Sequence, residues 1–475
     1  MRIKSLKVEN FYILKDFQID FNNNLSVLIG ENGSGKSTIL ELIADIFGHL
    51  YNYFVLGDKK TGVINDYQIH YEINDFDVFI ESSSFQSNTF QPNIKINGEN
   101  LSIFQIKTRY GNLKNFLPEK VVLSYSGITE RLKNLSDQFE KEFIRKIIKP
   151  NNPYSLKPLQ LPEVNPYMYI KKEYVSFVLL ALFVLNSKES ETILKKIGID
   201  INGCTTTITI KKPNWAKSKK TNDNNLWGIN TKIAVDLFRG LAEIGFLTKK
   251  NETEISYEFF GSNMIRDLFQ GEFELHANQV LSFLDTLLCD DLLGSITIEW
   301  NKTFSLDKLS EGEKQLLLSV GLSLVLNTKN ILFLLDEPDV SLHPKWQQEF
   351  ISNFEKGLDK ESMAIITTHS PNIVSDLQNR GLLLLRNGKI VTKSLKYYGK
   401  TVDSILGDYF NLASTRNNEV TEKISILWKL IQENKYEDDD FKEKLNNLES
   451  IIGADDIEIL AMNRDILRKK HEKNK

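Results

Sequence analysis

Cysteines, long apolar runs and an excess of positive charge are all missing from this sequence. The two cysteines in 475 residues, Cys204 and Cys289, have neither disulfide nor metal-ligand spacing, which is typical of a reducing compartment. The longest apolar run, residues 174–185, is too short to span a bilayer, and the first residues lack a signal peptide's apolar segment. A formal net charge of −4 gives no global field that would attract nucleic acid. We therefore expect a soluble cytoplasmic protein with no membrane contact.

A phosphate-binding pattern lies near the start of the chain. Residues 30–37 read Gly-Glu-Asn-Gly-Ser-Gly-Lys-Ser, which fits G-x-x-x-x-G-K-[ST], between a predicted strand (25–29) and a predicted helix (39–47). Backbone N–H groups of such a loop turn inward around phosphates, and the helix N-terminus favours anions. Lys36 is expected to reach the β- and γ-phosphates, and Ser37 to bind Mg²⁺. The sequence thus predicts ATP and Mg²⁺ as ligands. The predicted nucleotide-binding residues here are Asn32, Gly33, Ser34, Gly35, Lys36, Ser37 and Thr38.

Two carboxylates end an apolar run in the second half of the chain. Residues 331–335 are apolar, Asp336 and Glu337 follow, and a proline breaks the chain at once. A Mg²⁺–nucleotide site needs one acid on the metal and one to activate water. We assign Asp336 to Mg²⁺ and Glu337 to the general base. His369 follows the next predicted strand, residues 363–366, and is a third candidate.

The segment Leu-Ser-Glu-Gly-Glu at residues 309–313 opens a predicted helix over residues 314–326. Ser310 and Glu313 have the spacing of a capping box, and this local explanation serves these residues at least as well as a functional one.

Taken together and in this order, the motifs resemble those of ABC-type ATPase heads, the class that includes the SMC and RecF proteins. The resemblance implies an α/β P-loop head and a homodimer or higher oligomer with nucleotide sandwiched between heads. Ser310 and Gly312 of one subunit would contact the γ-phosphate held by the other, with Glu313 in the same signature set. Residues 339–344 would form the dimer-contacting D-loop, and His369 would sense the γ-phosphate.

Two features depart from that family pattern. The glutamine that these heads place after the phosphate loop is not identifiable; the loop at 124–127 and Gln105 are the candidates. No heptad is sustained between residues 36 and 309, so we expect a compact mixed α+β and helical insertion, as in OLD-like defence ATPases, in place of a long coiled coil.

The predicted organisation has four parts. They are an ATPase lobe with the phosphate loop and a β-rich segment (1–150), a mainly helical insertion (151–295), a second ATPase lobe (296–395) and a C-terminal helical segment for partner contact (396–475).

The C-terminal part narrows the resemblance. Residues 398–406 and the helices that follow are similar to the C-terminus of ATPases found beside HNH nucleases, including the Septu-type and retron-associated antiphage systems. This implies an ATPase that regulates an HNH nuclease partner in antiviral defence. The acidic clusters at 438–440 and 455–456 lie at polar turns or helix starts, where carboxylates are usually solvated, so we expect no nuclease site in this chain.

One alternative is a RecF-like repair or recombination ATPase that clamps DNA itself. Five lysines and Trp215 lie within residues 211–220 and could grip phosphates, although a solvated loop is the commoner meaning. We expect DNA contact mainly through the complex. A transporter ATPase subunit is a third reading, which the compact insertion disfavours.

Overall fold

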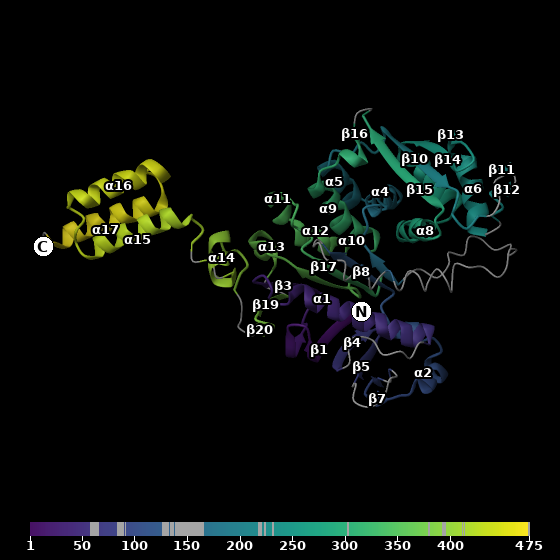
Figure 1. Cartoon of the computed structure of the whole chain (residues 1–475), viewed down its shortest axis with the longest axis horizontal. Helices are drawn as coiled ribbons and strands as arrows, with labels where there is room; N and C mark the ends of the chain where they lie inside the picture. The colour runs from purple at the N-terminus through teal and green to yellow at the C-terminus, as the bar shows by residue number, and fades with distance from the viewer. Residues whose placement is uncertain are drawn as a thin grey trace. The chain divides into compact units, whose positions relative to one another are not determined.

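The computed structural model describes residues 1–57, 66–82, 90, 92–125, 133, 137, 166–216, 221–222, 225–229, 232–301, 304–378, 381–391, 396–410, 412 and 414–473. The chain divides into two compact units, Met1–Gly399 and Lys400–Lys475 (Figure 1).

A seven-stranded sheet forms the centre of the larger unit, in the order β20-β19-β3-β18-β17-β8-β9. Its strands are β3 (Leu25–Gly30), β8 (Lys120–Tyr125), β9 (Tyr167–Tyr169), β17 (Ile331–Asp336), β18 (Met363–Thr367), β19 (Leu382–Arg386) and β20 (Lys389–Val391). Apart from the β19–β20 hairpin, these strands pair in parallel. Parallel strands covered on both faces are apolar throughout, which is why the runs at 25–29 and 331–335 predicted β3 and β17 correctly. The predicted α/β head fold is confirmed.

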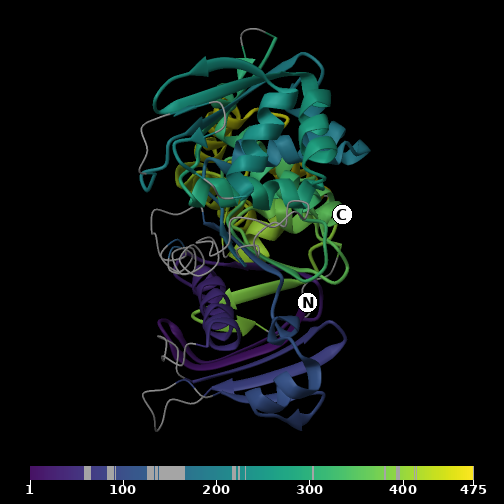
Figure 2. The ribbon, with the colours of Figure 1, turned by 90° about the vertical axis from the view of Figure 1, so that its right-hand side faces the viewer.

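A second, antiparallel sheet has the order β2-β1-β4-β5-β6-β7. Its strands are β1 (Arg2–Phe11), β2 (Leu14–Asp20), β4 (Tyr67–Ile73), β5 (Phe76–Ser82), β6 (Asn93–Ile96) and β7 (Glu99–Asn100), and α2 (Ile103–Tyr110) and the turn η2 (Leu113–Phe116) follow. Its apolar face shares one hydrophobic cluster with α1 (Lys36–Tyr51). Since α1 also contacts β3, β17 and β18, this helix lies between the two sheets (Figure 2).

The insertion combines helices with a five-stranded antiparallel sheet in the order β13-β14-β10-β15-β16. Its elements are α4 (Tyr174–Leu185), α5 (Lys188–Lys196), β10 (Cys204–Lys211), β11 (Thr221–Asn222), β12 (Asn225–Leu226), α6 (Lys232–Ile244), β13 (Phe246–Lys250), β14 (Glu254–Phe260), α7 (Gly261–Arg266), α8 (Ala277–Cys289), β15 (Leu293–Trp300) and β16 (Phe304–Ser305). The apolar run at 174–185 is the buried helix α4, as predicted. Tyr167–Tyr169 falls within the insertion that was predicted to be mainly helical, but it forms the strand β9 and pairs in parallel with β8.

The last part of the larger unit carries the remaining motifs. The helix predicted at 314–326 is present but contains a π-helical turn: it comprises α9 (Glu311–Leu316), η6 (Leu317–Gly321) and α10 (Leu322–Val325). Three short helices, α11 (Pro344–Gln347), α12 (Phe350–Gly357) and α13 (Pro371–Asp376), flank β18 in the chain.

The smaller unit contains the helices α14 (Val402–Phe410), α15 (Asn418–Gln432), α16 (Asp439–Ile452) and α17 (Ile457–Lys473). The last three enclose their own apolar cluster, to which Leu427, Leu448 and Met462 contribute. Asp439 and Asp440 lie in the first turn of α16, where carboxylates favour the helix dipole. None of the described helices combines the length and apolar character needed to cross a membrane.

Candidate functional site

A cavity of about 470 Å³, within the usual size range of ligand sites, opens at the loop between β3 and α1. The residues that line it come from three distant parts of the sequence: Tyr12, Ile13, Asn32, Gly33, Gly35, Lys36, Ser37, Thr38, Glu337 and His369. The phosphate loop therefore meets the two predicted catalytic side chains in one place. The reason is topological: β3, β17 and β18 are parallel, so the segments after their carboxyl ends gather at one sheet edge.

Two glycines of the phosphate loop are required by the local backbone, one by a close contact and one by its φ angle. A Cβ atom on Gly30 would lie 2.2 Å from the carbonyl oxygen of Leu385, and Gly35 has a φ of +107° directly before α1. No other residue meets both demands without strain.

The candidate magnesium site consists of Ser37 and Asp336. The Ser37 hydroxyl lies 2.9 Å and 3.0 Å from the two carboxylate oxygens of Asp336, and the Thr367 hydroxyl also donates to this carboxylate. Asp336 is only 4% exposed, and this burial raises its pKa, against the opposing effect of the two hydroxyls. Hydroxyl and carboxylate oxygens are hard donors that suit Mg²⁺, so the residues present fit this ion.

Lys36 lies buried at the base of the cavity. Its ammonium group donates to the carbonyl oxygens of Gly30 (3.0 Å) and Glu31 (3.2 Å). Burial lowers the pKa of Lys36, while the nearby Glu337 and Asp336 act in the opposite direction. A cation held by neutral carbonyls and facing a cavity is arranged to bind phosphate oxygens.

Glu337 and His369 form a pair at the cavity wall. The His369 Nε2 atom lies 3.2 Å from a carboxylate oxygen of Glu337. Glu337 has a φ of +48°, and its backbone N–H donates to both the carbonyl and the hydroxyl oxygen of Thr367, each at 3.1 Å. Burial, and then the charge of Lys36, lower the pKa of His369, so the ring is mostly neutral at pH 7. A neutral ring can orient the carboxylate without neutralising it.

The signature residues lie outside this cavity within one chain. Ser310 caps α9: its side-chain oxygen accepts from the Glu313 N–H (3.3 Å), while the Glu313 carboxylate accepts from the Ser310 N–H (2.7 Å). The capping-box reading is thus realised. Gly312 backs onto the loop after Glu337, because a Cβ atom there would lie 2.5 Å from the carbonyl oxygen of Ser341. The signature and the expected D-loop are therefore neighbours.

Gln105 and the loop at 124–127 were the candidates for the glutamine that ABC-type heads place after the phosphate loop. Gln105 caps α2, where its carbonyl oxygen accepts from the N–H of Ser102, and it does not line the cavity. Residues 126–127 lie outside the described part of the chain.

In the described part of the basic segment 211–220, side chains contact the end of the insertion's last helix and the turn after it. Lys211 forms an ion pair with Asp291 at 2.5 Å, and the Trp215 indole N–H donates to the carbonyl oxygen of Asp290. Residues 217–220 fall outside the described ranges.

Sequence reasoning missed Tyr12 and Ile13, which form the turn between β1 and β2 and line the cavity. Tyr12 has a φ of +52° and is 60% exposed, and its ring packs edge-on against Phe11. The turn itself was predictable, but nothing nearby in the sequence indicates that it faces Gly35. A Cβ atom there would meet Ile13 at 3.1 Å.

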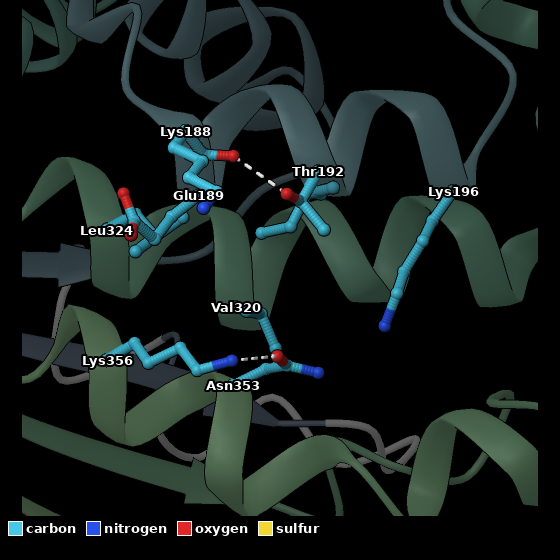
Figure 3. A pocket seen from close by; sticks show the side chains of 9 residues that line it. Lys188, Glu189, Thr192, Lys196, Val320, Leu324, Asn353 and Lys356 are labelled. Carbon is cyan, nitrogen blue, oxygen red and sulfur yellow. Dashed lines mark hydrogen bonds between the residues drawn. The ribbon is translucent and has the colours of Figure 1, made fainter.

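A smaller hollow of about 200 Å³ lies between α5, α10 and α12 (Figure 3). The side chains of Lys196 and Lys356 approach it from opposite sides, and Val320 and Leu324 contribute apolar surface. It contains none of the motif residues.

A phosphate loop between β3 and α1, two acids after β17, a histidine after β18 and a helix opened by the signature together define an ABC-type P-loop ATPase head. The chain belongs to the AAA ATPase domain family, whose sequence profile matches residues 1–374.

Individual relatives match shorter stretches. The Escherichia coli "Retron Ec83 probable ATPase" is 28% identical over 179 residues, which cover 35% of this chain and 33% of that protein. RecF of Oenococcus oeni, a DNA replication and repair protein, is 29% identical over 127 residues, 27% of this chain and 29% of that one. The Septu protein PtuA of Bacillus thuringiensis is 32% identical over 114 residues, 22% of this chain and 28% of PtuA. The matches thus span about a third of these relatives.

Among solved structures, the SMC head domain from Thermotoga maritima aligns with 82% of this chain and 98% of its own, at 13% identity and a TM-score of 0.32. The ATPrS-bound recombination mediator RecF aligns with 82% and 97%, at 15% identity and the same TM-score.

Proposed function

We propose that this chain hydrolyses ATP at the cavity between Lys36 and Glu337. The observation that carries the proposal is the contact between Ser37 and Asp336, which sets a magnesium-type donor pair at the mouth of the phosphate loop. Glu337 lies in the same cavity, where a general base for the attacking water has to be.

Each side chain has a distinct role in the proposed reaction. Lys36 and the loop N–H groups would hold the phosphates, and Ser37 and Asp336 would hold the metal, which would neutralise developing charge. Glu337 accepts a proton from the attacking water, and His369 orients Glu337 through its Nε2 atom. Thr367 fixes the Asp336 carboxylate.

We further propose that two heads pair head-to-tail around nucleotide. Ser310 is exposed at the start of α9, and the adjoining loop after Glu337 presents Val340 with 62% exposure. Because Gly312 backs onto Ser341, these two segments form one continuous surface that a second head can meet. Ser310 and Gly312 would then reach the γ-phosphate held by Lys36 of the mate.

The cellular role that we favour is control of an HNH nuclease partner in antiphage defence, in the cytoplasm. It is supported by the relatives whose names assign them to a retron and to Septu, and by the resemblance of the C-terminal helices. The insertion and the C-terminal helices are the proposed partner contacts.

The second candidate is a RecF-like ATPase that clamps DNA itself, and the RecF match favours it. The ion pair between Lys211 and Asp291 weighs against it, because part of the charge of the basic segment is already neutralised.

The test is co-expression of this chain with its neighbouring genes, followed by co-purification and by ATPase and nuclease assays. A stable complex with a nuclease, whose cleavage activity changes with ATP and is altered by Lys36→Ala, supports the defence role. A lone dimer that binds duplex DNA in ATP, with strong salt sensitivity, supports the clamp. Absence of any ATPase activity would refute both.

A further inference from the structure

The carboxamide of Gln347, at the end of α11, joins two loops of the catalytic edge. Its nitrogen donates to the carbonyl oxygen of Asp339 at 3.1 Å. Its oxygen accepts from the Ser370 hydroxyl at 2.9 Å and from the Asn372 side-chain amide at 3.0 Å. One half-buried side chain thus bridges the segment after Glu337 and the segment that contains His369.

A second link runs beside the first. The Thr368 hydroxyl donates to the Asp339 carboxylate at 2.9 Å and accepts from the Ser370 N–H at the same distance. His369 lies between Thr368 and Ser370, and Glu337 lies two residues before Asp339. Both members of the Glu337–His369 pair are therefore held from the same side by one polar network.

This network affects the placement of the Glu337–His369 pair more than the affinity for nucleotide. Gln347 does not line the nucleotide cavity, so it acts only through the two loops. A single hydrogen bond contributes about 1 kcal/mol, but a misplacement of about 1 Å at a reacting pair can cost about a hundredfold in rate.

We propose that Gln347 is a positioning residue, which sets His369 against Glu337 through its three hydrogen bonds. The proposal rests on the proposed ATP hydrolysis at Glu337. Because Gln347 bonds to both, the loop after Glu337 and the His369 loop move as one piece. The first of these loops carries the exposed Val340.

The test compares Gln347→Leu, which removes all three hydrogen bonds, with Gln348→Leu, an identical change at the exposed neighbouring position. We expect Gln347→Leu to lower kcat at least tenfold while the KM for ATP stays within about threefold, and Gln348→Leu to leave both unchanged. Gln347→Glu keeps the acceptor but loses the donor to Asp339, so kcat is expected to fall here as well.

A double-mutant cycle with His369→Ala separates positioning from simple loss of stability. If Gln347 acts through His369, adding Gln347→Leu to His369→Ala lowers the single-turnover rate little further. Additive effects, or a Gln347→Leu variant with the wild-type kcat, would overturn the inference. The proposed function fails separately, if wild-type protein lacks ATPase activity or if Glu337→Gln retains it.

Discussion

Replacing Glu337 with glutamine tests the assignment of the general base with minimal disturbance of shape. The substitution preserves the size of the side chain and the backbone N–H bonds to Thr367, and the new amide oxygen can still accept from the His369 ring. The change removes the negative charge of the side chain and with it the ability to take a proton. General-base catalysis contributes about 10²–10⁴-fold, so kcat should fall by that factor, or about 3–5 kcal/mol at 1.36 kcal/mol per decade.

The assay is phosphate release at saturating ATP and Mg²⁺, with Glu443→Gln on the exposed surface of α16 as the matched control. Light scattering of the same samples should show Glu337→Gln trapped as a nucleotide-bound dimer. A variant that keeps more than about a third of wild-type kcat would refute the role of Glu337. Scattering that stays at monomer size with ATP would count against head pairing.

Three further changes have defined outcomes. Burial raises the pKa of Asp339 from 3.8 to about 6, so its contribution to stability is complete below pH 3.8 and is lost as pH rises through 6. Asp339→Asn should therefore increase the free energy of unfolding at pH 8 by up to ~3 kcal/mol, with a matching rise in Tm, and this gain should vanish toward pH 4. Tyr12→Ala should raise the KM for ATP about 5- to 100-fold, and Tyr12→Trp should restore it, because base stacking is worth about 1–3 kcal/mol; an unchanged KM would exclude stacking. Leu448→Ala in the C-terminal cluster should cost about 2–5 kcal/mol, seen as faster hydrogen exchange in residues 418–473 with unchanged ATPase activity; unaltered exchange would contradict that core.

The elements that could be predicted are those whose signals are local. β3, β17 and β18 are apolar runs that end in motif residues, and α1 follows a phosphate loop whose glycines are fixed by spacing. Because parallel order gathers strand ends at one edge, motifs hundreds of residues apart could be assigned to a single site. The capping role of Ser310 could likewise be predicted from the four residues 310–313 alone.

What remained hidden depends on pairing partners that no local pattern discloses. Tyr167–Tyr169 is a strand only because β8 lies beside it. In the insertion sheet, β10 pairs with β14 and β15 from distant parts of the sequence, whereas β13–β14 and β15–β16 are local hairpins. Tyr12 and Ile13 are ordinary turn residues until the fold places them in the lining of the cavity, with Ile13 against Gly35. Gln347 carries no motif at all, and its importance rests on three partners from two other segments.

The order of the central sheet also governs when the protein can first bind its ligand. β3, which leads into the phosphate loop, is the first strand of the central sheet to be translated, yet both its neighbours, β18 and β19, come from residues beyond 360. During synthesis the phosphate loop therefore has no neighbouring strand of the central sheet until residues beyond 360 have been translated. Such long-range pairing is slow to form. A polypeptide that ended before β18 would lack both strands that flank β3, so its phosphate loop would have no support from the central sheet.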